Sequence, residues 1–376
     1  MRQRLICTVG TSLLSNLNNK VGLETGSIKQ PESWRNVSLF LLEKSNKDKV
    51  CGAEINSIAS ICQKGFLDRL TELTFLVSDT EEGKVTGQIL KLYYENQVNP
   101  IRFDNVEVIT LAGLNGKSFR EFQVRGLKSL VKEISNKARI FTPETIAINA
   151  TGGYKAQISF AGIIGQALDI PVYYMFEEFP EIIALPAQPV DLNLTFWFEH
   201  YPFFEQLYEE ETIAKDDLVD PYQGEYYDAL VDEVVVDGKS LVSLTPIGLL
   251  FHERCNLHFQ RDQSVLIQHI HKDYTKPSQK RICIRHDHGE EILGQVARKL
   301  CQSPYVKEII NSLPFNTRWV NPIRRIYDNG KLELVLTRTD QGLGLCVQTT
   351  GKNKAETGAI ARLLVEEYLQ DYVHGN

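Results

Sequence analysis

The first half of the chain alternates short apolar runs with amphipathic stretches, and this alternation constrains the fold more than any other feature. Apolar runs of about four to eight residues separated by helices are typical of a parallel sheet that helices cover on both faces. The predicted strands are 5–9, 73–78, 106–113, 145–153 and 170–176, and the predicted helices between them include 83–94, 118–135 and 155–169. We therefore predict a doubly wound, Rossmann-like α/β domain over residues 1–190.

Two further segments follow this domain. Residues 191–276 are expected to form a small winged-helix-like α+β module, with a helical stretch (199–213), a hairpin (233–244) and a helix that Thr245 caps. Residues 277–376 are expected to form a separate α+β domain. Its predicted elements are strand 281–286, helices 288–301 and 304–312, strands 318–327, 331–339 and 343–349, and helix 354–372. Asp287 and Glu290 are expected to form a capping box for helix 288–301.

The net charge of −7 is unevenly distributed along the chain. Residues 1–190 sum to +1, residues 191–276 to −11 and residues 277–376 to +3, so only the last segment attracts a phosphate backbone. The seven cysteines are scattered without a CxxC pair, which indicates buried thiols rather than disulfides or a zinc site. No run of about 18 apolar residues occurs and the apolar N-terminal stretch is too short for a signal peptide, so we expect a cytoplasmic protein without a membrane span.

Small hydroxyl and glycine residues follow three of the predicted strands. They are Gly10, Thr11 and Ser12, then Ser78 and Thr80, then Thr151, Gly152 and Gly153, with Lys155 beside the last group. Ligands of doubly wound sheets bind beyond the carboxyl ends of the strands, and backbone N–H groups in such turns bind phosphate. These turns therefore predict a phosphate-bearing ligand. The chain has neither GxGxxG nor GxxxxGK[ST], so neither a dinucleotide cofactor nor ATP is indicated. We also expect no metal and no other cofactor.

The Gly-Thr-Ser turn at 10–12 and the stretch NATGGYKAQ at 149–157 resemble CARF domains, which are Rossmann-like sensors of cyclic oligoadenylate in type III CRISPR immunity. The stretch LTPIGLLFHER at 244–254 is similar to the segment that follows the sensor in one branch of that family. The resemblance implies a homodimer that binds the ligand across its two-fold axis through the turn residues named above, with cyclic tetra-adenylate as the favoured ring. An isologous dimer matches the rotational symmetry of such a ring. Ser12 and Lys155 could also support slow cleavage of the ligand.

The third segment resembles the RelE superfamily of toxin ribonucleases in size, order of elements and basic charge. A sensor fused to such a domain resembles the CRISPR-associated mRNA interferases, which implies a metal-independent endoribonuclease that cleaves mRNA on the ribosome. The side chains expected to hold the scissile phosphate and stabilise the transition state are Arg318, Arg324, Arg325, Arg338 and Lys352. Alternation along a strand points Arg324 and Arg325 to opposite faces. His286 and His288 are weaker candidates for general acid or base.

Two other functions stay open at this point. A ring nuclease would degrade cyclic oligoadenylate, and a ligand-controlled transcription regulator would use the winged-helix-like module, although the acidic charge of that module disfavours DNA binding. A metal-dependent restriction-type nuclease is disfavoured because Asp340-Gln341-Gly342 does not supply the Glu/Asp-x-Lys pattern. The acidic segment is expected to be a spacer, or a docking surface for a basic ribosomal protein that would raise the effective concentration of the nuclease near its substrate.

Overall fold

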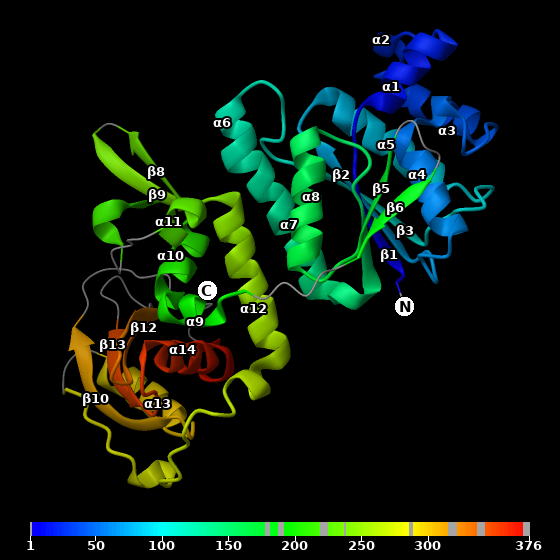
Figure 1. The fold of residues 1–376 in the computed structure, drawn as a ribbon. Helices are drawn as coiled ribbons and strands as arrows, with labels where there is room; N and C mark the ends of the chain where they lie inside the picture. Colours follow the sequence, from blue (N-terminus) through cyan, green and yellow to red (C-terminus); the bar gives the residue numbers. More distant parts are fainter. Residues whose placement is uncertain are drawn as a thin grey trace. The chain divides into compact units, whose positions relative to one another are not determined.

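The structure, a computed structural model, describes residues 2–176, 181–186, 192–218, 225–236, 238–285, 289–314, 322–336 and 343–370. The chain divides into two compact units, residues 1–190 and residues 191–376 (Figure 1). Within the described ranges, no helix combines the length and the apolar character needed to cross a membrane.

The first unit is built on a six-stranded sheet with the order β3-β2-β1-β4-β5-β6. The strands are β1 (Arg4–Thr8), β2 (Glu72–Ser78), β3 (Asn105–Leu111), β4 (Ile146–Asn149), β5 (Val172–Met175) and β6 (Ile182–Leu185). The first five are parallel, and β6 pairs with β5 in the antiparallel sense. The parallel sheet and its strand order confirm a Rossmann-like domain.

Helices cover both faces of this sheet (Figure 1). They are α1 (Ser12–Asn16), η1 (Leu17–Val21), α2 (Thr25–Ile28), α3 (Pro31–Leu42), η2 (Lys49–Cys51), α4 (Gly52–Gln63), α5 (Glu81–Glu95), α6 (Phe119–Glu121), η3 (Phe122–Gly126), α7 (Leu127–Phe141), η4 (Pro143–Thr145) and α8 (Lys155–Ala167). Helices α3, α4 and α5 share a buried apolar core with Leu5, Cys7 and Phe75 of the sheet. Helices α7 and α8 pack against each other on the other face.

The second unit begins with helices and a small sheet of order β7-β9-β8. Its first elements are α9 (Leu194–Glu199), α10 (Tyr201–Glu210), β7 (Ile213–Ala214), η5 (Lys215–Asp217), α11 (Glu225–Leu230), β8 (Val231–Val236), β9 (Lys239–Leu244) and α12 (Pro246–Leu266). Strands β8 and β9 form the predicted hairpin. The Thr245 hydroxyl accepts a hydrogen bond of 2.9 Å from the Gly248 N–H, which confirms the predicted cap of α12. The winged-helix identity of this region stays a prediction.

The rest of the second unit contains an antiparallel sheet of order β10-β13-β12-β11. Its elements are η6 (Pro277–Gln279), α13 (Glu290–Leu300), β10 (Val306–Pro314), β11 (Ile323–Ile326), β12 (Lys331–Leu336), β13 (Leu343–Thr349) and α14 (Lys354–Tyr368). Leu332, Leu334 and Leu336 are each at most 1% exposed, as predicted, but Glu333 and Val335 between them are also buried, so burial along β12 does not alternate. The RelE-like identity of this region stays a prediction.

Two predicted elements near the start of this region were wrong. Residues 304–312 are not a helix but contribute most of strand β10. Bulges between Val306 and Glu308 and between Ile309 and Asn311 interrupt its alternation, and this gives the apolar residues of a strand the spacing of a helix. Residues 281–286 form no strand where they are described, and only an isolated bridge joins Ile282 to Ile309.

The predicted start of helix 288–301 was also wrong. Helix α13 begins at Glu290, and its N-cap is Gly289 with a left-handed φ of 84°. A glycine in that conformation starts the helix where a residue with a side chain would be strained. Asp287, the other half of the predicted capping box, lies outside the described residues.

Helix α14 packs against α9 within the second unit. A Cβ atom on Gly358 would lie 2.8 Å from the backbone carbonyl carbon of Phe198, so only a glycine permits this approach. The first and last helices of the unit therefore share one core. The predicted division of this unit at residues 276 and 277 stays a prediction.

Candidate functional site

The strand order reverses between β1 and β4, and the carboxyl ends of these strands are where a doubly wound sheet binds ligands. From β1 the chain continues through β2 to the edge strand β3, and it then returns through α7 to place β4 on the other side of β1. Residues 10–12 follow β1 and lead into α1, whose first residue is Ser12, and residues 151–153 belong to the turn after β4. We call these the β1 turn and the β4 turn.

The structure brings the two turns into direct backbone contact. A Cβ atom on Gly10 would lie 2.8 Å from the backbone nitrogen of Gly153, and one on Gly152 would lie 3.0 Å from the backbone nitrogen of Gly10. The Thr8 hydroxyl donates a hydrogen bond to the Gly152 carbonyl. The glycines of both sequence motifs are therefore required because two strand ends meet there without room for side chains.

Gln157 holds the β4 turn from the first turn of α8. Its buried side chain accepts a hydrogen bond of 3.3 Å from the Tyr154 N–H and donates one of 3.4 Å to the Leu76 carbonyl. Gly153 has a φ of 113°, a conformation that favours glycine. The β4 turn is thus fixed to β2 as well as to the β1 turn.

Glu54, on α4, lies beneath both turns and was not predicted as a site residue. Its Oε1 atom accepts a hydrogen bond of 2.7 Å from the Gly10 N–H, and the residue is only 1% exposed. Burial raises the pKa of this carboxyl, against the opposing effect of the hydrogen bond from Gly10. The Gly10 N–H therefore points at Glu54 rather than outward at a ligand.

Three of the predicted ligand contacts are exposed polar residues in or next to the two turns. Thr11, Ser12 and Lys155 are exposed, and within the described residues neither hydroxyl has a hydrogen-bond partner. Lys155 is the first residue of the 13-residue helix α8, whose N-terminus carries a positive partial charge. The β1 turn and the start of α8 together offer hydroxyls and a cation to an anionic ligand.

Three other predicted contacts use their hydroxyl groups inside the fold. The hydroxyl oxygens of Ser78 and Thr80 lie 2.9 Å apart, and Thr80 caps α5 by accepting a backbone N–H at 3.0 Å. The Thr151 hydroxyl donates to Asn149 Oδ1 at 2.6 Å and accepts from the Met175 N–H at 3.1 Å. These hydroxyls stabilise the frame of the site, and their contact with a ligand stays a prediction.

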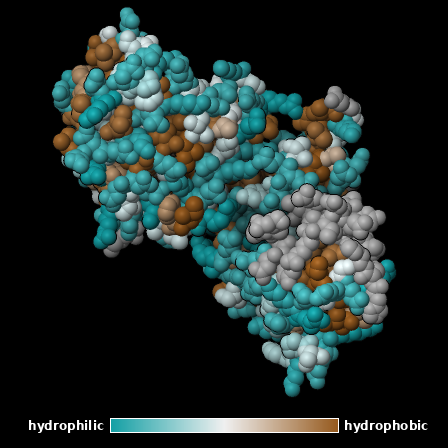
Figure 2. Space-filling model, turned by 180° about the vertical axis from the view of Figure 1, so that it is seen from behind, coloured by the Kyte–Doolittle hydropathy of each residue, from teal (hydrophilic) through white to brown (hydrophobic). Residues whose placement is uncertain are grey.

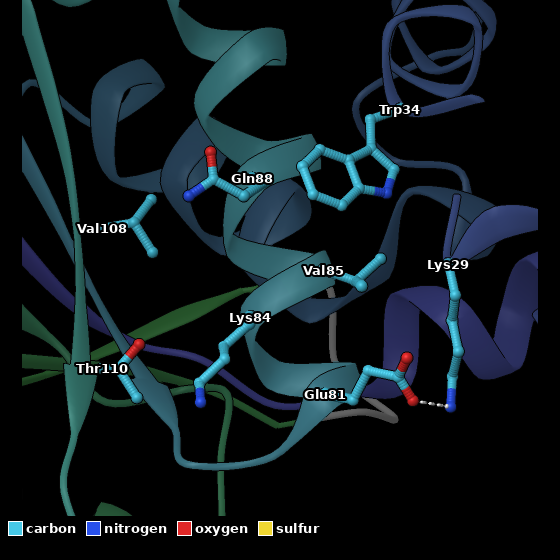
Figure 3. Close-up of a pocket in the computed structure, with 8 residues that line it drawn as sticks. All are labelled: Lys29, Trp34, Glu81, Lys84, Val85, Gln88, Val108 and Thr110. Atoms are coloured by element: carbon cyan, nitrogen blue, oxygen red, sulfur yellow. Dashed lines mark hydrogen bonds and ion pairs between the residues drawn. The ribbon is translucent and has the colours of Figure 1, made fainter. Parts of the chain in front are cut away.

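A separate surface cavity of about 700 Å³ lies beside α5, and its lining includes Trp34, Val85, Gln88, Val108 and Thr110 (Figure 3). Lys29 at its rim lies 2.6 Å from Glu81 and 2.7 Å from Glu82. Lys84 lies 2.9 Å from Asp79 and, with the Gly113 N–H, lowers the pKa of that carboxyl. Carboxylates already neutralise both lysines. This cavity is therefore a poorer anion site than the switch point, which is the place where the strand order reverses between β1 and β4.

In the second unit, the described candidate residues lie on the sheet and in the turn that follows it. A bulge between Ile323 and Arg325 interrupts β11. Regular alternation, on which the prediction of opposite faces for Arg324 and Arg325 rested, therefore does not apply to this strand. Arg324 Nη1 lies 3.9 Å from Glu333 Oε2, and Arg325 is the cross-strand partner of Glu333. Lys352 is exposed, and its backbone N–H donates to Glu356 at the start of α14.

The polar face around Glu333 was not predicted. The Tyr327 hydroxyl donates to Glu333 Oε1 at 2.8 Å, and the Lys331 ammonium lies 4.9 Å from the centre of the Tyr327 ring. In the parts of the chain that the structure describes, no group of three or more His, Cys, Asp or Glu side chains is placed to hold a metal ion. Four sequence candidates lie outside the described residues, namely His286, His288, Arg318 and Arg338.

The parallel sheet defines a Rossmann-like domain, and the packed turns at the carboxyl ends of β1 and β4 are its candidate ligand site. Within this unit, residues 49–188 match the model of a CRISPR-associated protein family, Cas_APE2256. The match includes Glu54 and the β4 turn and covers less than half of the chain. It supports the predicted resemblance to CRISPR-associated proteins over these residues.

One solved structure gives a weaker comparison. The chain is similar to Can2 from Sulfobacillus thermosulfidooxidans in complex with cyclic tetra-adenylate, with 12% sequence identity over 74% of this chain and 69% of that chain. The TM-score is 0.26, which does not establish a common fold.

Proposed function

We propose that this chain is an ancillary effector of type III CRISPR immunity, in which cyclic oligoadenylate binding to the first unit activates a ribonuclease in the second. The observation that carries the proposal is the pair of packed turns at the switch point, within a sequence that matches a CRISPR-associated family. Thr11, Ser12 and Lys155 add outward-facing hydroxyls and a cation, which suit the phosphodiester groups of such a ring. Cyclic tetra-adenylate is the ring that we favour, in line with the complex described for Can2.

The proposed active form is a homodimer with the ring on its two-fold axis. Tyr154, the N-cap of α8, and Ile163, the ninth residue of the helix, are 37% and 45% exposed, so α8 carries two large side chains on its surface. Figure 2 shows that apolar residues gather in separate patches on an otherwise hydrophilic face of the molecule. A second copy of the chain is the partner that would cover α8. Titration of cyclic tetra-adenylate should then give one ring for two chains.

The proposed catalytic unit is the antiparallel sheet with Arg324, Arg325 and Lys352, together with Arg318 and Arg338. Basic side chains on such a sheet stabilise the charge that develops when a ribose 2′-hydroxyl attacks the adjacent phosphate. Because Glu333 lies close to Arg324, we place the greater share of this role on Lys352 and on residues that Glu333 does not neutralise. The substrate is mRNA, engaged on the ribosome, and the reaction requires no metal.

The experiment that tests this function follows mRNA integrity in a reconstituted translation mixture with and without cyclic tetra-adenylate. We expect cleavage only when the ligand is present, and loss of cleavage in the Lys352→Ala variant. Consumption of the ligand without RNA cleavage would instead establish a ring nuclease. The exposed Ser12 hydroxyl is the observation that keeps this second function in view.

A further inference from the structure

The carboxyl group of Glu54 lies directly beneath the turns proposed to bind phosphate, although a carboxylate repels an anion. It is 1% exposed, its Oε1 accepts the Gly10 N–H, and its Oε2 has no hydrogen-bond partner among the residues that the structure describes. Gly152 closes the space above it, since a Cβ atom there would lie 2.9 Å from Glu54 Cδ. An acid in this position needs a physical explanation.

No cation compensates the charge of Glu54 among the described residues, because no Lys, Arg or His acts on it. The Gly10 N–H and the N-terminus of α4, where Glu54 is the third residue, favour the ionised form. Burial opposes both and is the largest effect, so the pKa of Glu54 is raised. A buried carboxyl without a cationic partner favours the neutral, protonated form.

The titratable groups that face Glu54 offer it no positive charge. They are the Cys7 thiol on β1 and the Tyr94 hydroxyl on α5; burial raises the pKa of both, and the charge of Glu54 raises each a little further. Of the other elements packed against α4, α1 and β6 carry no titratable side chain. The remaining titratable residues on packed elements are Lys49 and Cys51 of η2 and Tyr173 and Tyr174 of β5.

We propose that Glu54 is the positioning residue of the ligand site and couples binding of the phosphodiester ligand to the uptake of one proton. The proton adds to Oε2, the oxygen without a partner, and Oε1 continues to accept the Gly10 N–H. The floor of the site is then neutral when phosphate lies above it. Without the proton, the buried negative charge repels the ligand through a single layer of backbone. The inference rests on the proposed function and adds a pH dependence to it.

The composition of the first unit limits which groups can take up this proton. Residues 1–190 contain no histidine, so no imidazole can titrate there near neutral pH. Phosphodiesters stay ionised throughout this range, and the pKa values of Cys7 and Tyr94 are raised away from it. A carboxyl with a raised pKa is therefore the group expected to take up a proton when the ligand binds.

The test is calorimetric titration of the full-length protein with cyclic tetra-adenylate from about pH 5.5 to 8.5, in two buffers of different ionisation enthalpy. The wild type should take up a proton, and its Kd should rise by up to about tenfold per pH unit above the pKa of Glu54. Glu54→Gln keeps an oxygen for the Gly10 N–H, so it should bind with a Kd independent of pH and without proton uptake. At the highest pH it should bind more tightly than the wild type.

Glu133→Gln is the matched control. Glu133 is a partly buried carboxyl on α7 whose pKa burial also raises, and its pKa is influenced by Glu107 and Lys137 rather than by the turns. This variant should keep the pH dependence of the wild type.

Binding by the wild type without proton uptake, or a pH dependence that persists in Glu54→Gln, would overturn the inference and leave the proposed function intact. If no variant binds the ring at any pH, the proposed function fails and the inference fails with it. Should Glu54→Gln not fold, the proton uptake of the wild type and of Glu133→Gln decides the matter: uptake close to one proton supports the inference, and none refutes it.

Discussion

The contact between Gly152, Gly10 and Glu54 predicts that one added methyl group will disrupt the candidate ligand site. In Gly152→Ala the new Cβ atom would lie 2.9 Å from Glu54 Cδ and 3.0 Å from the Gly10 nitrogen. Neither neighbour is free to move, because the carboxyl is buried and holds the Gly10 backbone through a hydrogen bond. Overpacking of this kind costs about 1–3 kcal/mol.

Hydrogen exchange of the full-length protein, followed by mass spectrometry, measures the loss of local stability in the strands next to Gly152. A loss of about 1–3 kcal/mol corresponds to roughly 5- to 150-fold faster exchange of the amides in β1 and β4. Gly162→Ala, on α8, is the control because its Cβ atom would meet nothing within 4 Å. Alanine is favoured over glycine inside a helix by about 0.5–1 kcal/mol, so exchange in the control should be unchanged or slower.

A double-mutant cycle tests whether the clash is with Glu54 itself. Glu54→Ala removes the carboxyl, so it should cost less in the Gly152→Ala background than in the wild type, with a coupling of about 0.5–3 kcal/mol. Strictly additive costs, or unchanged exchange in Gly152→Ala, would refute the packing argument for this site.

Three further predictions concern other residues. Lys155→Ala should weaken cyclic tetra-adenylate binding about 10- to 100-fold in calorimetry, as expected for a charge-assisted hydrogen bond, whereas Lys155→Arg should retain most of the affinity. Thr245→Ala should destabilise the second unit by about 1 kcal/mol in thermal unfolding, because α12 loses its cap; an unchanged melting temperature would contradict this. Lys352→Ala should slow RNA cleavage by about 100-fold or more, and Arg324→Ala should slow it less because Glu333 lies close to Arg324, while Arg281→Ala, whose side chain is 75% exposed, should leave the rate unchanged.

Much of the fold of the first unit could be predicted from local patterns. Its parallel strands are short apolar runs bounded by turns, and Thr80 caps the helix that follows β2. No element was predicted between residues 13 and 72, although α3 begins with Pro31 and α4 presents Ile55 and Ile58 on one buried face. These short helices gain their stability from packing in the unit, which local propensity does not report.

Strand β10 shows why the second unit was harder to predict. Its apolar residues have helical spacing because bulges insert extra residues opposite β13, and a bulge depends on the partner strand. The bulge in β11 has the same effect on Arg324 and Arg325. In both cases the tertiary pairing decides which face a side chain occupies.

The sequence predicted those site residues whose type is required by close contact between two backbone segments. It did not predict the residue whose role depends on its burial in the folded chain. Gly10 and Gly152 stand out in the sequence because their turns touch. Glu54 looks like an ordinary acid in the first turn of a helix, a position that usually faces solvent. Only the folded chain places it under Gly10, 44 residues earlier in the sequence.

The most direct test of the account is the rate of mRNA cleavage on translating ribosomes, measured with and without cyclic tetra-adenylate and compared with naked RNA. The account predicts ligand-dependent cleavage that requires translating ribosomes and is lost in both Lys155→Ala and Lys352→Ala. Cleavage at the same rate without the ligand, or intact mRNA while the ligand remains bound, would contradict a sensor that switches a ribonuclease.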